Sequence, residues 1–485
     1  MSPADAAVLA SYYATLGILT VYSVHRLHLV SLRRRCAAPP RLTTLTQWPS
    51  VTIQLPLYNE PNVAARLIDA VCAIEYEGIL DVQVLDDSND ETTAIVAERV
   101  THWSLRGVRI AHVRRASRDG YKAGALAHGL RLSSAQLFAV FDADFVPAPD
   151  VLARMVPYFA DAEVGMVQAR WGHLNRERSL LTRVQAIFLD AHFAVESAAR
   201  NFGGRFFNFN GTAGIWRREA IEQAGGWSAS TLTEDLDLSY RAQLAGWRFV
   251  FLNDVEVPAE LPAALSGFQQ QQHRWAKGSI QTARKLAGPI LATSLRGSVK
   301  TEALFHLTNN SAYLLTLVLA LLIVPTIVIR QRLGIVWTYA FDLVLFALST
   351  ASVLWFYLEG QRYAGRARPR LRELLAVLPV GVGMSVRNAA AVVEGLFESG
   401  GEFRRTPKEG NGPKAKSMSP IRPKGLIRPI VPIGETALFL FFLAAFGSFV
   451  AARQWVSLPF LGIFLGGYGY VVFHAIKERV FSRLA

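Results

Sequence analysis

The apolar runs constrain this chain most, because a run long enough to cross a bilayer has no place in an ordinary soluble core. Residues 6–24, "AAVLASYYATLGILTVYSV", contain no charged side chain. Four further runs lie at 311–329, 335–358, 433–451 and 456–475. Hydrophobic residues make up 51% of the 485 residues, as expected when part of a chain is embedded in lipid. We therefore predict five membrane spans.

The charges beside these runs predict their orientation. Arg33, Arg34 and Arg35 follow the first run, and positive residues favour the cytosolic side. The N-terminus is therefore expected outside, and the pattern favours a retained anchor over a cleaved signal peptide. The basic segment that follows 335–358 and the basic segment 404–429 fall on the same, cytosolic side. We expect an integral protein of the plasma (inner) membrane.

One apolar segment, 373–398, fits a span poorly. Arg387 and Asn388 lie in its middle, where a charge at the bilayer centre is costly. A helix that lies in the membrane interface keeps the remaining topology consistent. We therefore predict five spans and one interfacial helix.

The formal net charge of +13 would also suit a protein that binds nucleic acid. Here the basic residues cluster beside the apolar runs, which favours contact with anionic lipid headgroups and no nucleic-acid partner. The two cysteines, Cys36 and Cys72, both fall on the predicted cytosolic side and are expected to be reduced thiols.

The region 31–300 has no comparable apolar run and reads as alternating strands and helices. Its predicted strands, at 51–60, 80–90 and 137–147, each end in polar or acidic residues. Strands separated by helices indicate a mainly parallel α/β sheet, in which ligands bind at the carboxyl ends of the strands. The acids that should converge there are Asp86, Asp87, Asp142 and Asp144.

Asp142 and Asp144 form a D-x-D pattern in "FDADF", directly after a predicted strand. Two carboxylates so placed can hold Mg²⁺ or Mn²⁺ that completes its shell with phosphate oxygens. Two solvated loop acids are the alternative. Lys122 in "RDGYKAGAL" offers a cation to a diphosphate, although the spacing is not that of an ATP-type phosphate loop.

The stretch "STLTEDLDLSYRAQLAGW" concentrates Glu234, Asp235 and Asp237 at the expected start of a helix. Acids are favoured there by the helix dipole, so helix capping explains them without any chemistry. General acid–base catalysis is the second explanation, and the helix pattern alone does not decide between the two.

Taken in order, these motifs resemble the membrane-embedded family 2 glycosyltransferases, a group that includes cellulose, hyaluronan and chitin synthases. Their pattern is an early Asp, a D-x-D, a T-E-D and a Q-x-x-R-W. The chain matches it with Asp86 or Asp87, with Asp142 and Asp144, with Glu234 and Asp235 after Thr233, and with Gln271, Arg274 and Trp275. "GYKAGAL", "FNFNGTAGIWR" and "TLTEDLDLSYRAQLAGW" are similar to the cellulose-synthase-like branch of glucomannan 4-beta-mannosyltransferases.

The resemblance implies a GT-A type, Rossmann-like cytosolic domain and a role for each matched residue. Asp86 or Asp87 would bind the nucleotide base, Asp142 and Asp144 the Mg²⁺ or Mn²⁺. Lys122, Gln271 and Arg274 would bind the rest of the nucleotide sugar. Asp235 would be the catalytic base, with Glu234 orienting it or the acceptor, and Asp237 would be structural. The residues expected at the acceptor are Trp275, Asn210 and Gly211.

"EFRRTPK" resembles the gating loop of cellulose synthase, F-x-V-T-x-K. Phe403, Thr406 and Lys408 match that pattern, while Arg405 stands in place of the valine. The predicted organisation is an anchor at 1–30, a GT-A domain at 31–300 and a hairpin of spans at 301–360. The interfacial helix and gating-type loop follow at 361–430, and a second hairpin at 431–485.

The implied activity is an inverting and processive transfer of hexose from UDP-glucose or GDP-mannose to a growing beta-linked glycan, which then passes through the membrane. A single transfer to a lipid, as in ceramide glucosyltransferases, shares the D-x-D and Q-x-x-R-W motifs and is the alternative within enzymology. A transporter or scaffold with a degenerate domain is the alternative outside it, and intact carboxylates argue against that class.

Overall fold

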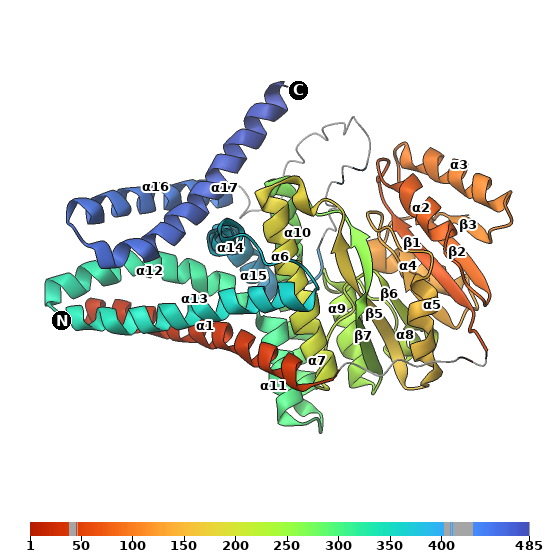
Figure 1. The fold of residues 1–485 in the computed structure, drawn as a ribbon, viewed down its shortest axis with the longest axis horizontal. Coiled ribbons are helices and arrows are strands. Elements are labelled where there is room, and N and C mark those ends of the chain that lie inside the picture. Colours follow the sequence, from red (N-terminus) through yellow and green to blue (C-terminus); the bar gives the residue numbers. More distant parts are fainter. Residues whose placement is uncertain (38–44, 46, 402–407, 409, 411–429, 485) are drawn as a thin grey trace.

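The structure is a computed structural model that describes residues 1–37, 45, 47–401, 408, 410 and 430–484. A domain of helices and strands lies at one end of the molecule, and a group of long helices lies at the other (Figure 1). Helix α10, Leu265–Ala292, stands between these two parts (Figure 1).

The α/β domain is built on one seven-stranded sheet with strand order β3-β2-β1-β4-β6-β5-β7. Strands β1, β2, β3 and β4 run parallel, β6 is antiparallel to both its neighbours, and β5 runs parallel to β7. The strands are β1 Val51–Leu57, β2 Leu80–Asp86, β3 Ile110–Val113, β4 Leu137–Val140, β5 Val164–His173, β6 Gly214–Arg217 and β7 Arg248–Ala259. The predicted mainly parallel sheet is confirmed.

The helices of this domain connect the strands and cover both faces of the sheet. They are α2 Ala64–Cys72, α3 Thr92–Ser104, α4 Tyr121–Arg131, α5 Val151–Met155, α6 Leu180–Ala191, η3 His192–Ser197, α7 Ala198–Phe202, α8 Arg218–Gln223 and α9 Glu234–Leu244. In β4 the side chains of Leu137 and Ala139 join one buried cluster, and those of Phe138 and Val140 join another. This alternation places one hydrophobic core on each face of the sheet.

Five helices are long and apolar enough to cross a membrane, as the apolar runs predict. They are α1 Pro3–Arg35, α12 Ser311–Leu333, α13 Tyr339–Tyr363, α16 Ile430–Ala451 and α17 Leu458–Leu484. Helix α1 extends beyond the predicted run on both sides and carries its arginines in its last turn. A further helix, α11 Gly297–Thr308, precedes α12.

The doubtful segment 373–398 forms two helices instead of one, α14 Leu371–Gly383 and α15 Ser385–Phe397, bent by 47° at the break between them. Together they are long and apolar enough to count as a sixth, broken span or as a re-entrant loop. The interfacial position stays a prediction, whereas a single continuous helix is wrong.

Buried contacts hold the α/β domain against the long helices. One hydrophobic cluster joins Leu29 of α1, Val184 of α6, Phe268 of α10 and Phe356 of α13. Beside it, buried Asp190 accepts hydrogen bonds from Arg176 at 2.6 Å and from Gln361 of α13 at 3.0 Å. The domain is therefore fixed to the first hairpin by apolar packing and by charge-assisted hydrogen bonds.

Candidate active site

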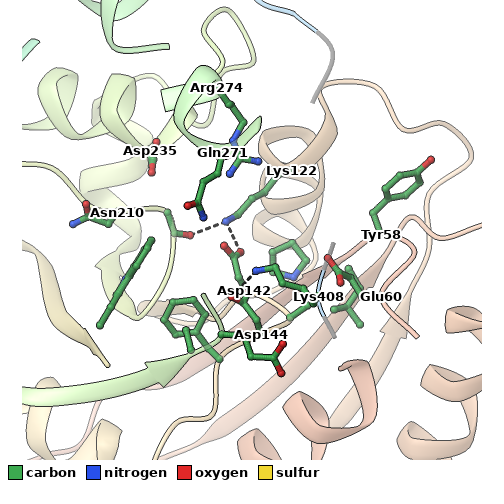
Figure 2. A pocket seen from close by; sticks show the side chains of 18 of the residues that line it. Tyr58, Glu60, Lys122, Asp142, Asp144, Asn210, Asp235, Gln271, Arg274 and Lys408 are labelled. Carbon is green, nitrogen blue, oxygen red and sulfur yellow. Dashed lines mark hydrogen bonds and ion pairs between the residues drawn. The ribbon is translucent and has the colours of Figure 1, made fainter. Parts of the chain in front are cut away.

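A cavity of about 140 Å³ opens at the carboxyl ends of β1, β2 and β4, where a parallel sheet places its ligands. Figure 2 shows that the labelled side chains reach it from different segments of the chain. The predicted site residues that line it are Asp87, Lys122, Asp142, Asp144, Asn210, Gly211, Glu234, Asp235, Gln271, Arg274, Trp275 and Lys408. Residues more than 300 positions apart therefore meet at one place.

The two D-x-D carboxylates follow β4 and each contacts a lysine. Lys122, in the first turn of α4, donates to Asp142 Oδ1 and to the Gly211 carbonyl oxygen at 2.8 Å (Figure 2). Lys408 Nζ lies 2.5 Å from Asp144 Oδ2. Burial alone would lower the pKa of Lys122, but the charges of Asp142 and Glu234 raise it above its usual value.

Asp142 and Asp144 offer hard carboxylate oxygens, the ligand type that Mg²⁺ and Mn²⁺ prefer. Among the described residues, no group of three or more His, Cys, Asp and Glu side chains is arranged to hold a metal ion. Two carboxylates fit a cation that takes further oxygen ligands from a bound diphosphate. The site therefore suits a metal that arrives with its substrate.

Glu234 and Asp235 form the first turn of α9, next to this pair of lysine-bound acids. Burial, and then the charge of Glu234, raise the pKa of Asp235 to about 7, against the opposing charges of Lys122 and Arg274. A carboxylate with a pKa near neutrality is suited to accept a proton. Asp237 of the same helix is fully buried and pairs with Arg241 at 2.8 Å and Lys285 at 2.7 Å.

Two glycines bring these elements close to one another. A Cβ on Gly211, whose φ is +81°, would lie 2.9 Å from Asp235 Oδ2. A Cβ on Gly278 of α10 would lie 2.5 Å from a side-chain carbon of Thr233. The absence of side chains at these positions lets Asp235 and α10 approach the same point.

Helix α10 presents Gln271, Arg274 and Trp275 to the cavity from consecutive turns of one face. The ring centroid of Trp275 lies 6.4 Å from that of Trp171, at the end of β5. The indole Nε1 of Trp171 is buried and has no hydrogen-bond partner among the described residues. Trp171 was not predicted from the sequence, because an aromatic residue in a buried strand is normally part of the core.

The structure distinguishes Asp86 from Asp87, the two residues that could match the early Asp of the motif pattern. Asp87 lines the cavity and is held by Arg115, whose Nε lies 3.0 Å from Asp87 Oδ1. Asp86 is buried behind it, 2.9 Å from the ring of His112. Burial would raise the pKa of Asp86, but hydrogen bonds with His112 and Ser88 lower it to about 2. Asp87 is therefore better placed to meet a ligand.

Tyr58 and Arg118 also line the cavity near Asp87, and neither was predicted from the sequence. The guanidinium carbon of Arg118 lies 3.3 Å from the centroid of the Tyr58 ring. Tyr58 follows β1 in the polar turn "YNE", which was the available signal. Of the predicted gating-type residues, Lys408 is placed in the cavity, and Phe403 and Thr406 lie outside the described residues.

A second cavity, of about 410 Å³, adjoins the first and extends toward the long helices. Asp235, Asn210, Trp171, Trp275 and Gln271 line both cavities. The wall of the second also carries hydroxyl, imidazole and charged side chains, namely Tyr22, Arg26, His192, Glu196, His306, Tyr313 and Tyr357. Asp235 thus lies where an acidic, lysine-containing cavity meets a larger aromatic and polar one.

Comparisons with known proteins agree with this arrangement. The model of "Glycosyltransferase like family 2" matches residues 49–278. A probable glucomannan 4-beta-mannosyltransferase 15 of Arabidopsis thaliana is 44% identical over 250 residues, 50% of this chain and 47% of the relative. Glucomannan 4-beta-mannosyltransferase 1 of Oryza sativa subsp. japonica is 37% identical over 401 residues, 78% of this chain and 73% of the relative.

The chain spans about half the length of the first curated relatives that it matches, 47% and 52%. Among solved structures, a mannosyltransferase of Pyrobaculum calidifontis, in complex with GDP-Man and Mn²⁺, is similar with a TM-score of 0.50. It shares 20% sequence identity, and the match covers 81% of this chain and 99% of that one. The predicted GT-A type fold is confirmed.

Proposed function

The chain belongs to the family 2 glycosyltransferases, in the cellulose-synthase-like branch of the glucomannan 4-beta-mannosyltransferases, and we propose that it extends a beta-linked glycan by inverting transfer of hexose. The observation that carries this proposal is the position of Asp235, which lines both cavities. The first cavity suits a nucleotide sugar and the second suits an acceptor. A base at their junction can deprotonate the hydroxyl that attacks the sugar.

On the donor side, Asp87 and Tyr58 would meet the nucleotide base, and Lys122, Gln271 and Arg274 the diphosphate. Asp142 and Asp144 would hold Mg²⁺ or Mn²⁺, which neutralises charge on the leaving diphosphate when it is bound. Lys122 contributes to the same neutralisation, because its ammonium group is fixed beside Asp142. The curated relatives are named mannosyltransferases, and the similar mannosyltransferase structure holds GDP-Man, so we favour GDP-mannose as the donor, with UDP-glucose as the competitor.

On the acceptor side, Asp235 takes the proton of the attacking hydroxyl while that oxygen displaces the diphosphate. A single displacement inverts the anomeric carbon, so an α-linked donor gives a beta-linked product. Trp275, Asn210 and Gly211 would hold the terminal sugar of the acceptor, with the indole ring against its apolar face. Burial and then the charge of Glu234 raise the pKa of Asp235 to about 7, so Asp235 is a stronger base than an ordinary carboxylate.

The second cavity favours a glycan acceptor over a lipid acceptor. Burying charged groups such as Arg26 and Glu196 against acyl chains would be costly, whereas sugar hydroxyls can hydrogen-bond with them. The five apolar helices indicate a membrane protein, and the arginines at the end of α1 favour a cytosolic catalytic domain at the plasma membrane. A product that grows into the second cavity would move toward the spans.

The test uses the purified protein in nanodiscs with Mn²⁺ or Mg²⁺, radiolabelled GDP-mannose and UDP-glucose, and size analysis of the product. We expect a long beta-linked polymer from one donor, and loss of activity in EDTA. A single sugar found only on added lipid would instead establish the glycolipid alternative. Full activity in EDTA would contradict the metal site.

A further inference from the structure

A π-helical turn carries two titratable side chains to the wall of the second cavity. Helix η3, His192–Ser197, interrupts an otherwise continuous helix between α6 and α7. Such turns are rare and occur frequently at functional sites. Both His192 and Glu196 line the second cavity, and the mechanism proposed above uses neither of them.

These two side chains belong to a series of partly buried polar contacts that starts at Asn210, on the proposed acceptor side of the site. His192 Nε2 lies 2.9 Å from Asn210 Oδ1, and His192 Nδ1 lies 3.1 Å from Glu196 Oε2. Arg200 continues the series, with Nη1 3.4 Å from Glu196 Oε2 and Nε 3.0 Å from Glu302 Oε1. The two ring nitrogens of His192 thus connect Asn210 with Glu196.

The environment of Glu196 keeps its carboxylate ionised at the cavity wall. Burial alone would raise the pKa of Glu196, but the charge of Arg200, the hydrogen bond with His192 and the charge of Arg26 together lower it far below its usual range. Arg26 of α1 lines the same cavity, as do the hydroxyl-bearing Tyr313 and Tyr357. A fixed carboxylate therefore faces a cavity that also offers donors.

This combination has the chemistry of a site for a neutral, hydroxyl-rich ligand. An ionised carboxylate accepts hydrogen bonds from hydroxyl groups more strongly than a neutral acceptor does. The aromatic ring of Phe188, which lines the same cavity, offers an apolar surface for the carbon face of a sugar. An acyl chain would cover the Glu196 carboxylate without donating a hydrogen bond to it, which is less favourable than contact with sugar hydroxyls.

We propose that Glu196 and His192 form a hydroxyl-binding subsite for the acceptor glycan, at the sugar unit that follows the terminal unit beside Asp235. The contact between His192 and Asn210 links this subsite directly to the terminal one. The proposal rests on the proposed function, because it assumes that the second cavity holds the acceptor. It adds that recognition of the acceptor extends beyond one sugar and depends on these two residues.

Glu302 provides a matched control for Glu196. Both glutamates pair with Arg200, but Glu302 of α11 is 3% exposed and is not among the described residues that line the cavity. If Glu196 acts only as a partner of Arg200, Glu196→Gln and Glu302→Gln will change acceptor binding to the same extent. If Glu196 contacts the glycan, only Glu196→Gln will change acceptor binding.

The experiment measures the Kd of beta-linked oligosaccharides of one to four hexose units in nanodiscs, by intrinsic tryptophan fluorescence, and the acceptor KM in parallel. In the wild type, adding the second hexose unit should lower the Kd by about tenfold, as expected for a hydrogen bond to a charged group. Glu196→Gln should remove that gain while leaving the donor KM and donor hydrolysis without acceptor unchanged. His192→Gln, which keeps a donor in the side chain, should retain part of the gain, and His192→Phe should lose it.

Two results would overturn the subsite. One is an equal change of the oligosaccharide Kd in Glu196→Gln and Glu302→Gln. The other is a second hexose unit that still lowers the Kd in both Glu196→Gln and His192→Phe. The binding readout also separates this inference from the proposed function. Oligosaccharides that bind with the predicted length dependence but receive no sugar would disprove the polymerising activity and support the subsite.

Discussion

Two acidic pairs face the same cavity and are held in opposite ways. Asp142 and Asp144 each contact a lysine, so their negative charge is balanced within the site. Glu234 and Asp235 adjoin each other in one helical turn, and burial with mutual repulsion brings the pKa of Asp235 to about 7. In the proposed mechanism, neighbouring charges therefore decide which carboxylates would bind a cation and which would accept a proton.

The largest expected effect comes from removing the proposed proton acceptor, Asp235. Asp235→Asn keeps the size of the side chain and abolishes its basicity, so the transfer rate should fall by about 10²- to 10⁴-fold. Single-turnover transfer from radiolabelled donor measures this, with donor binding as the control for an intact first cavity. Transfer at the wild-type rate would show that Asp235 is not the base, and the proposed difference between the two acidic pairs would then be wrong.

Removing a carboxylate of the proposed cation-binding pair should give a smaller defect that metal can reverse. In Asp144→Asn the Mn²⁺ concentration for half-maximal activity should rise by about tenfold or more, because one of two hard oxygen ligands is weakened. Excess Mn²⁺ should restore much of the rate in this variant, and none of it in Asp235→Asn. Equal responses of the two variants to metal would show that the two acidic pairs do not differ in role.

The pH dependence tests why the pKa of Asp235 is raised. Asp235 must be ionised to accept a proton, so log kcat/KM should fall as the pH drops through about 7. Glu234→Gln removes a negative neighbour and should move this acidic limb to lower pH, by about one unit. Lys122→Gln removes a positive neighbour and should move the limb to higher pH. A limb that stays in place in both variants would assign it to another group.

Asp237→Asn should have the smallest effect on catalysis, although it lies in the same helix. Its carboxylate pairs with Arg241 and Lys285 and does not line the first cavity among the described residues. The loss should lower stability by roughly 2 kcal/mol, since Lys285 remains partly exposed to water. Thermal unfolding in nanodiscs measures this cost. An altered pH profile would mean that Asp237 also acts on Asp235.

The order of the motifs in the sequence predicted which residues would meet. D-x-D, T-E-D and Q-x-x-R-W follow buried strands or lie on a helix face, so regular secondary structure is enough to bring them to one sheet edge. The choice between Asp86 and Asp87 was not predictable in this way. It depends on where β2 ends, because the last strand residue, Asp86, is buried beside His112 while the next residue reaches the cavity.

Other features depend on contacts between distant segments and have no local signal. Trp171 lies in a strand whose pattern indicates only a buried core, yet it adjoins Trp275 at the junction of the cavities. The π-helical turn at 192–197 lies within a sequence of ordinary helical composition. The bend between α14 and α15 likewise replaces a helix that the apolar run predicted to be continuous.

Helix α10 has a consequence for how inhibitors of this protein should behave. Gln271 and Trp275 line both cavities, and Arg274 lines the first, so in the proposed mechanism this one helix would contact donor and acceptor together. A small molecule that fills the second cavity and displaces α10 would disturb the contacts of the first as well. Its inhibition should therefore be mixed with respect to the nucleotide sugar, even though the two molecules never compete for the same space.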